Sequence, residues 1–201
     1  MKELQQILLF LHKIEKLKTI KRKVSISDNS RKESPAEHTW RVAIMAMILH
    51  RELKLEIDLI KSIEIILVHD IIEAVAGDVW ILDKNDTKTK NEQKIKELQA
   101  AEEIYNLLPN DHSIELKDLW LEYENQSSEE AKFARALDKI EVIIQRIDLG
   151  EKNWERNDIH EILHDWANDS VASFPQLHNI WTLIQQELQE MHKNSMIPHA
   201  K

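Results

Sequence analysis

The stretch from residue 34 to residue 49 reads SPAEHTWRVAIMAMIL, and it opens with a strong signal for the start of a helix. Ser34 can cap the helix, the proline that follows suits the first helical position, and Glu37 stands three residues after the cap, which completes a capping box. The apolar residues beyond it recur every three or four positions. We therefore predict a helix that runs to about Leu53, with His38 in its first turn.

A second stretch, ILVHDIIEAVAGD at residues 66–78, places a polar pair inside an apolar helix. The predicted helix begins after a cap at Asp58 and stops at Gly77, a residue type that suits the left-handed position after a helix. The residues before His69 are almost continuously apolar, so this helix should be central and buried. Burying a carboxylate such as that of Asp70 is very costly without a partner, so the pair requires an explanation.

The composition indicates an all-α protein. The 201 residues include two glycines and four prolines, whereas sheet hairpins need glycine in their tight turns. Hydrophobic residues make up 42% and charged residues 31% of the chain, which is typical of helices joined by short polar loops. Further helices are predicted at about residues 4–17, 88–108, 115–123, 128–150, 157–166 and 175–191, with a polar loop at 18–31 and a second capping box at 127–130.

Charge and residue usage limit the classes of function. The formal net charge is −9, and no long basic run occurs outside residues 16–23, which argues against binding to a nucleic-acid polymer. The absence of cysteine excludes disulfides and thiolate metal sites, and it fits a reducing cytoplasm. No uncharged stretch is long enough to span a bilayer, and the charged N-terminal segment predicts an amphipathic helix rather than a signal peptide. We expect a cytoplasmic protein without a membrane partner.

Three polar positions interrupt otherwise apolar predicted helices: His38, the pair His69 and Asp70, and Asp138. Each of them alone could be an isolated polar residue with a satisfied hydrogen bond, which is the commoner case. One divalent metal ion bound by two imidazoles and two carboxylates would satisfy them all at once. This ligand set suits Mn, Co, Ni, Fe or Zn, and the identity of the ion stays open among these and Mg.

Two further acids follow the polar pair. Glu73 lies one predicted turn after His69, and Asp78 follows just beyond the predicted end of the helix. Carboxylates that point into a site already rich in carboxylates should have coupled pKa values. This makes both acids candidates for proton transfer.

These stretches resemble the motifs of the HD-domain metal-dependent phosphohydrolases, and within them the 5′-deoxynucleotidase-like branch. The resemblance rests on residues 34–49 and 66–78, on LWLEYENQSSEEAKFARALDKIE at 119–141, and more loosely on LKTIKR at 17–22. It covers about residues 5–150. The expected architecture is a single HD-type helical bundle over residues 1–201 with a buried metal site, a motif core at about 17–150 and C-terminal helices at about 157–192.

The resemblance implies a role for each matching position. The implied metal ligands are His38, His69, Asp70 and Asp138, and the implied catalytic acids are Glu73 and Asp78. Together they imply metal-assisted hydrolysis of a phosphate ester, in which the acids handle the protons of the attacking water and the leaving group.

Substrate contacts are implied for three other residues. Arg22 matches an arginine that contacts phosphate, and Trp80 could stack on a base or lie in the core. In characterised deoxynucleotidases the arginine is followed by a tryptophan that helps to exclude the ribose 2′-hydroxyl, whereas Lys23 stands here. Lys23 could add a cation for phosphate, and the preference between ribose and deoxyribose stays open.

The activity implied is that of a 5′-nucleotidase, which releases phosphate from (deoxy)nucleoside 5′-monophosphates. Two alternatives are hydrolysis of another phosphate compound, such as a guanosine polyphosphate, and a regulatory module that binds nucleotide or metal without turnover. Hydrolases of guanosine polyphosphates usually carry Glu-Asp after the doublet, whereas Ala74 follows Glu73 here. A module without turnover should lack an acid at 73 or 78, and both acids are present. The resemblance and the C-terminal tryptophans also favour a homodimer.

Overall fold

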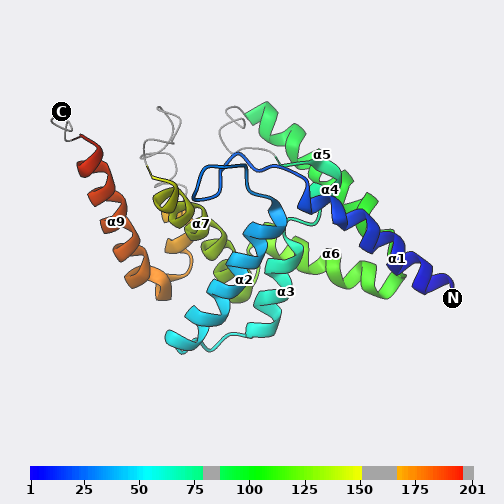
Figure 1. The fold of residues 1–201 in the computed structure, drawn as a ribbon. Helices are drawn as coiled ribbons and strands as arrows, with labels where there is room; N and C mark the ends of the chain where they lie inside the picture. The colour runs from blue at the N-terminus through cyan, green and yellow to red at the C-terminus, as the bar shows by residue number, and fades with distance from the viewer. Residues whose placement is uncertain (79–86, 151–166, 197–201) are drawn as a thin grey trace.

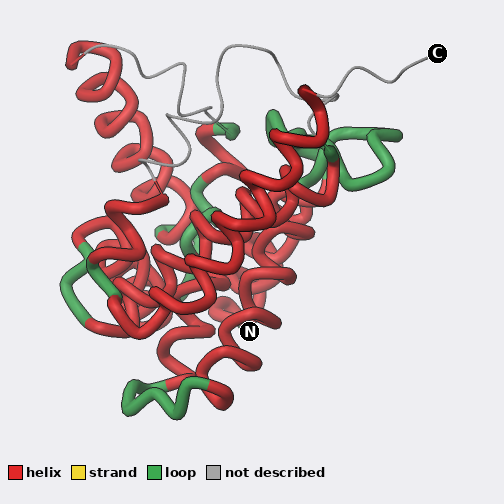
Figure 2. The backbone as a smooth tube through the Cα atoms, turned by 90° about the vertical axis from the view of Figure 1, so that its left-hand side faces the viewer, coloured by secondary structure: helices red, strands yellow, loops and turns green. Residues whose placement is uncertain are grey.

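The computed structural model describes residues 1–78, 87–150 and 167–196 (Figure 1). The elements are α1 (Lys2–Ile14), η1 (Glu15–Lys18), α2 (Pro35–Glu52), α3 (Leu59–Val68), α4 (Glu73–Ala76), α5 (Thr87–Tyr105), α6 (Asn110–Asn125), α7 (Glu129–Leu149), η4 (Pro175–Leu177) and α9 (His178–Met196). Within the described residues Figure 2 shows helices and loops, and the one strand-like pairing is an isolated bridge between Ser25 and Lys32. The all-α prediction is confirmed, although α5 ends and α6 begins earlier than expected. The helix predicted at 157–166 lies outside the described residues.

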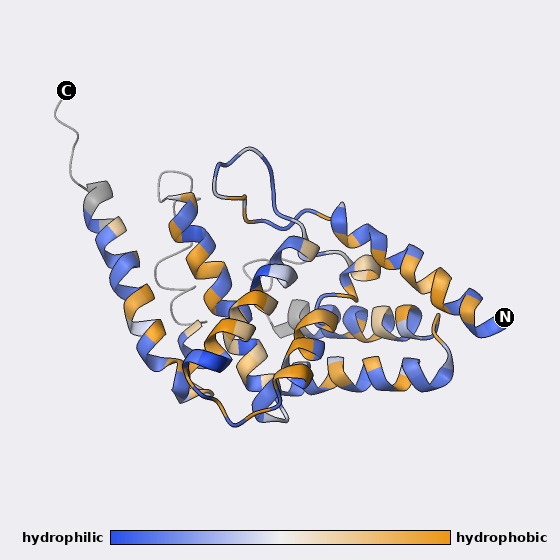
Figure 3. Ribbon diagram, turned by 60° about the horizontal axis from the view of Figure 1, so that its bottom comes forward, coloured by the Kyte–Doolittle hydropathy of each residue, from blue (hydrophilic) through white to orange (hydrophobic). Residues whose placement is uncertain are grey.

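Two apolar clusters hold the helices together. One joins α2, α3, α7 and α9 through buried residues such as Ile65 and Leu137, and the other joins α1, α5 and α6 through residues such as Phe10 and Ile104. Because α3 contributes to both clusters, it is the central helix that its apolar sequence predicts (Figure 1). Figure 3 shows hydrophobic and hydrophilic residues alternating along the helices, as expected when one side of each helix is buried. No helix among the described residues is long and apolar enough to cross a membrane.

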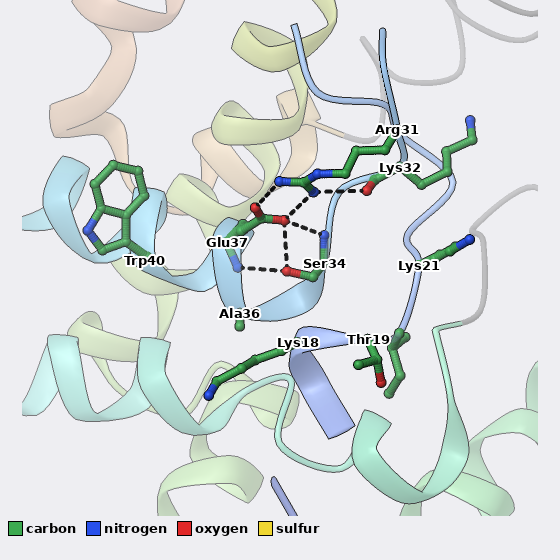
Figure 4. Close-up of a pocket in the computed structure, with 10 residues that line it drawn as sticks. Lys18, Thr19, Lys21, Arg31, Lys32, Ser34, Ala36, Glu37 and Trp40 are labelled. Atoms are coloured by element: carbon green, nitrogen blue, oxygen red, sulfur yellow. Dashed lines mark hydrogen bonds and ion pairs between the residues drawn. The ribbon is translucent and has the colours of Figure 1, made fainter. Parts of the chain in front are cut away.

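The start of α2 follows the prediction. Ser34 Oγ accepts a hydrogen bond from the Glu37 N–H at 3.3 Å, and Glu37 Oε2 accepts one from the Ser34 N–H at 3.0 Å, so the capping box is formed. Arg31 donates to both oxygens of the same carboxylate, at 2.5 and 2.9 Å (Figure 4). The cap therefore fixes the register of α2 and places His38 in its first turn, fully buried.

The polar loop before α2 folds back on itself as a hairpin, residues 22–33. The Arg22 N–H donates to the carbonyl of Glu33 at 2.8 Å, which pairs the two ends of the hairpin. The side chain of Gln145 on α7 donates to the backbone carbonyl of Ser25 at 3.0 Å, in a buried hydrogen bond. These contacts hold the hairpin on α7 and carry Arg22 into the protein.

One predicted helix proves to be two. The apolar pattern predicts a continuous helix up to Gly77, but α3 ends at Val68, with His69 as its C-terminal cap. The chain then turns, with the Glu73 N–H donating to the carbonyl of Asp70 at 3.0 Å, and α4 begins at Glu73. The prediction was wrong because the apolar sequence continues across the break and contains no local stop signal. Gly77 ends α4 with a φ of 77°, in the left-handed region that glycine tolerates.

The helix α7 is capped differently from the prediction. Ser128 Oγ accepts a hydrogen bond from the Ala131 N–H at 3.1 Å, so Ser128 is the cap and the predicted box at 127–130 does not form. Glu130 instead accepts a hydrogen bond from the Asp58 N–H at 3.1 Å, which ties the beginning of α3 to that of α7. This contact helps to set α3 beside α7, where the polar residues of both helices meet.

Candidate metal and phosphate site

His69 presents one ring nitrogen to the interior. Its Nδ1–H donates to the backbone carbonyl of Ile66 at 2.6 Å, so Nδ1 carries a proton and Nε2 is the nitrogen that faces the other polar groups. Nε2 is buried and makes no hydrogen bond, although Asp70 Oδ1 lies 3.1 Å away. A histidine that binds a metal through one nitrogen usually donates from the other in this way.

His38 is held between two carboxylates. Its Nδ1 donates to Glu141 Oε2 at 2.6 Å, and its Nε2 lies 3.0 Å from Asp138 Oδ1. In the absence of a cation this arrangement requires a proton on each nitrogen, because carboxylates only accept hydrogen bonds. Burial and Arg22 lower the pKa of His38, but Glu141 and Asp138 outweigh them and raise it to about 10. The two carboxylates therefore favour positive charge at His38.

Asp138, on α7, is fixed through its second oxygen. Tyr123 OH donates to Oδ2 at 2.5 Å, and Lys139 Nζ donates to the same oxygen at 2.7 Å. The ring of Tyr123 also lies against His69, with 5.0 Å between the ring centroids. Asp138 Oδ1 is thereby left to face His38, and the carboxylate has a defined orientation before any ligand binds.

The structure brings three of the four predicted ligands into one group. The ligand atoms of His38, His69 and Asp138 all lie within 4.8 Å of one another and are buried. Asp70 adjoins this group through the 3.1 Å approach of its Oδ1 to His69 Nε2. Two imidazoles and two carboxylates fit a divalent cation, and the unsatisfied buried nitrogen of His69 is the observation in this structure that calls for one.

Arg22 reaches the same group from the hairpin. Its Nη1 lies 3.2 Å from Asp70 Oδ2, its Nε lies 3.2 Å from Glu33 Oε2, and its side chain is 12% exposed. Burial lowers the pKa of Arg22, but Asp70 and Glu33 outweigh this and raise it above its ordinary value. A permanently charged guanidinium beside the ligand group can bind the oxygens of a phosphate.

The two predicted acids lie at the edge of this group, and both are partly buried. Glu73 opens α4, and its Oε2 is buried without a hydrogen-bond partner. Burial, Asp70 and Asp78 raise the pKa of Glu73 to about 10. Burial also raises the pKa of Asp78, although Arg22 opposes the shift. Carboxyls with pKa values displaced in this way mark candidates for proton transfer.

Two residues predicted to contact the substrate remain, Lys23 and Trp80. Lys23 is exposed, and its backbone hydrogen-bonds the carboxyl of Asp78, so the residue touches the site through its main chain. Trp80 lies outside the described residues.

Sequence reasoning missed four residues of the site. Glu141, Tyr123 and Lys139 contact predicted ligands, and Glu33 contacts Arg22. Glu141 lies one helical turn after Asp138, and this spacing is a signal that could have found it. Glu33 is a buried acid in an otherwise polar hairpin, and Tyr123 comes from another helix. For these two residues the sequence contains no local signal, because their contacts depend on how the helices pack.

The phenol of Tyr123 offers a first test of the ligand group. Tyr123→Phe removes the hydrogen bond to Asp138 Oδ2 but keeps the ring that packs on His69, so the carboxylate should lose orientation without loss of packing. We expect the affinity for a divalent cation to fall about 10- to 100-fold, as for other hydrogen-bond partners of ligands. Calorimetric titration of metal into the metal-free protein measures this. Tyr105→Phe is the matched control, since Tyr105 is buried and donates only to the Val68 carbonyl.

Comparisons with known proteins agree with this geometry. The family described as HD domain matches residues 14–178 of the chain. The 5′-deoxynucleotidase HDDC2 of Mus musculus is 41% identical over 140 residues, which cover 69% of this chain and 67% of that protein. The 5′-deoxynucleotidase HDDC2 of Xenopus laevis is 33% identical over 186 residues, covering 91% and 88% respectively.

A solved structure is similar over almost the whole chain. It is a crystal structure from Magnetospirillum magnetotacticum, named as a predicted metal-dependent phosphohydrolase. The two structures superpose with a TM-score of 0.82 at 26% sequence identity, and the match covers 97% of this chain and 98% of the other.

Proposed function

Because this chain belongs to the HD-domain family of metal-dependent phosphohydrolases, we propose that it is a 5′-nucleotidase that releases phosphate from (deoxy)nucleoside 5′-monophosphates. The observation that carries the proposal is the position of Arg22, whose guanidinium lies 3.2 Å from Asp70 beside the buried ligand group. A fixed cation next to a metal-ligand set is suited to binding a phosphate ester. The names of the relatives, all 5′-deoxynucleotidases, add the nucleotide as substrate.

The residues that would hold the metal are His38, His69, Asp70 and Asp138, and the ion is one of Mn, Co, Mg, Ni, Fe or Zn. Glu141 accepts a hydrogen bond from Nδ1 of His38, and the Ile66 carbonyl accepts one from Nδ1 of His69. Both hydrogen bonds fix the orientation of the ring, which supports this ligand set. A bound divalent ion supplies Lewis-acid chemistry, which makes water more acidic and polarises a phosphoryl oxygen.

The protein's own residues carry the remaining tasks. Arg22 binds and orients the phosphate, and Lys23 adds positive charge at its rim. Trp80 is a candidate to stack on the base. Glu73 accepts a proton from the attacking water, and Asp78 delivers a proton to the departing 5′-oxygen or holds the substrate. A pKa of about 10 would keep Glu73 protonated at neutral pH, whereas a positive charge placed in the site opposes that shift and leaves the carboxylate ionised, as a proton acceptor must be.

An assay of phosphate release tests the function directly. The metal-free protein is incubated with ribo- and deoxyribonucleoside 5′-monophosphates of each base, with Mn, Co or Mg added back. We expect release from at least one monophosphate, and the ratio of deoxyribo- to ribonucleotide turnover reports the sugar preference. If no monophosphate is hydrolysed with any of the metals while guanosine polyphosphate is, the chain is a phosphohydrolase of another class. Binding without release from any of these compounds would indicate a regulatory module.

Replacing Arg22 with lysine tests the phosphate contact. Arg22→Lys keeps a positive charge but loses the planar fork that contacts Asp70 and Glu33 together. We expect KM for the preferred monophosphate to rise about 10- to 100-fold, the equivalent of one lost hydrogen bond to a charged group. Steady-state kinetics measure this. Arg31→Lys is the control, because Arg31 lies in the same hairpin but pairs with Glu37 at the surface, and its KM should stay unchanged.

The further properties of the chain are also proposals. We propose that residues 1–201 form a single HD domain that acts as a homodimer in the cytoplasm, on a small-molecule nucleotide and without a nucleic-acid polymer or a membrane as partner. The cysteine-free sequence supports the reducing compartment, and the net charge of −9 argues against a polymer of phosphates. Sedimentation of the purified protein measures the oligomeric state.

A further inference from the structure

The outer side of α2 is apolar although it faces solvent. The exposed fractions of its residues are 65% for Trp40, 40% for Ile44, 36% for Met47 and 61% for Ile48. Ile44 and Ile48 follow Trp40 by four and eight residues, and Met47 follows Ile44 by three, so the four residues share one side of the helix. The opposite side carries His38 and the core. We call the stripe from Trp40 to Ile48 the α2 face. Contiguous apolar surface of this kind usually marks an interaction site.

The charges at the ends of the α2 face make it complementary to itself. Glu37 lies on the same side of the helix in the first turn, where its carboxylate also pairs with Arg31, and Arg51 lies on that side in the last turn. Ile44 is midway between Glu37 and Arg51, and it is also midway between Trp40 and Ile48. A surface arranged symmetrically about its middle residue, with opposite charges at its two ends, matches a second copy of itself turned by a two-fold axis.

We propose that the α2 face is the interface between two copies of this chain, with the two α2 helices antiparallel and the two-fold axis at Ile44. The inference rests on the homodimer of the proposed function and names its surface. In this arrangement Trp40 packs against Ile48 of the second copy, and Glu37 faces the other copy's Arg51. Antiparallel pairing also sets the positive end of each helix dipole beside the negative end of the other.

A pocket at the beginning of α2 adds charge complementarity. The residues that line it from α2 include Ala36, Glu37 and Trp40. Its cationic side chains are Lys18 from η1, Lys21 from the segment that follows, and Arg31 and Lys32 from the hairpin (Figure 4). With the axis at Ile44, the residue of the second copy opposite Ala36 is Glu52. Each pocket would therefore receive the last turn of the other α2, in which Glu52 and the negative dipole end face the cations while Arg51 faces Glu37. The net charge of −9 argues against an anionic membrane surface as the occupant.

Cross-linking through a single cysteine tests the position of the axis, because the natural chain contains no cysteine. In Ile44→Cys the two thiols would lie near the axis, so a short bis-maleimide should convert the chain to a species of twice its mass on a denaturing gel. Leu8→Cys is the matched control, since Leu8 is equally apolar and 53% exposed but lies on α1. We expect no linked species from Leu8→Cys at the same protein concentration.

A charged substitution tests the energetics of the face. Ile48→Glu places a carboxylate where Trp40 of the second copy should pack, and we expect the dissociation constant of the dimer to rise at least tenfold by analytical ultracentrifugation. Ile60→Glu, on the equally exposed Ile60 of α3, should leave it unchanged. Circular dichroism and metal content identify any variant that fails to fold, and in that case Arg51→Glu replaces Ile48→Glu.

The outcomes separate this inference from the proposed function. If Ile44→Cys is cross-linked and Ile48→Glu raises the dissociation constant of the dimer, the results support the α2 face as the interface. If the chain is a dimer but Ile44→Cys is not linked and Ile48→Glu does not weaken the dimer, the α2 face is not the interface. The homodimer itself then stands. A monomeric natural chain overturns both, while phosphate release decides the nucleotidase independently. Flotation of the monomer with vesicles of phosphatidylcholine and phosphatidylserine, abolished by Ile48→Glu, would assign the face to a membrane instead.

Discussion

The Asp70→Ala variant is expected to lose its divalent metal and its turnover together. Asp70 is one of two carboxylates in the proposed ligand set, and its other oxygen is the one that Arg22 approaches at 3.2 Å. Since the bound ion contributes several kcal/mol to stabilising the reaction, we expect turnover to fall about 10³-fold or more. Metal content after dialysis, measured by mass spectrometry, and the rate of phosphate release check the two losses.

The same substitution should also reduce stability for a reason separate from the metal. Without Asp70, the buried guanidinium of Arg22 keeps Glu33 as its one ion-pair partner among the described residues. Removing one partner of a buried ion pair costs about 3 kcal/mol or more. Denaturant unfolding in the presence of a chelator isolates this effect, because both proteins are then metal-free.

Glu129→Ala is the matched control for Asp70→Ala. Glu129 is an exposed acid in the first turn of α7 that pairs with Lys132 at 2.6 Å at the surface. Its replacement should change neither metal content nor turnover. Unchanged metal content in Asp70→Ala would show that the ligand assignment is wrong, whatever happens to activity.

Local rules predicted those parts of the fold that local hydrogen bonds determine. The capping box of Ser34 and Glu37 sets the register of α2 within four residues, so the place of His38 could be read from the sequence. The positive φ of Gly77 and Gly150 likewise follows from residue type at a helix end. In each case the atoms that form the feature are neighbours in the chain.

Features that depend on packing could not be predicted in this way. The break between α3 and α4 lies within apolar sequence, and it turns Asp70 toward Arg22, a residue of the hairpin. The buried position of Glu33 likewise depends on the hairpin folding against α7. Asp138 was identified mainly through the family resemblance, because nothing local relates it to His38, which is 100 positions away. The site was therefore predicted as a set of residues, whereas its supporting hydrogen bonds required the structure.

The Glu73→Gln variant is expected to retain its metal but lose most of its turnover. Glutamine has the size of glutamate and can occupy the same place in the first turn of α4, but it cannot accept a proton from water. General base catalysis contributes about 10²- to 10⁴-fold, so kcat should fall by a factor in that range. The buried Glu73 Oε2 has no hydrogen-bond partner among the described residues, so the substitution removes no hydrogen bond between them at this oxygen. Steady-state kinetics with the preferred monophosphate, together with metal analysis, check the prediction.

Two further variants serve as controls for Glu73→Gln. Glu64→Gln, on the exposed side of α3, should behave as the natural chain and excludes a general effect of lost charge. Asp78→Asn distinguishes the two acids: if Asp78 delivers the proton to the leaving group, substrates with more acidic leaving groups should restore its kcat but not that of Glu73→Gln. If Glu73→Gln keeps its kcat while its metal content is unchanged, Glu73 is not the base, and its raised pKa reflects only its burial between Asp70 and Asp78.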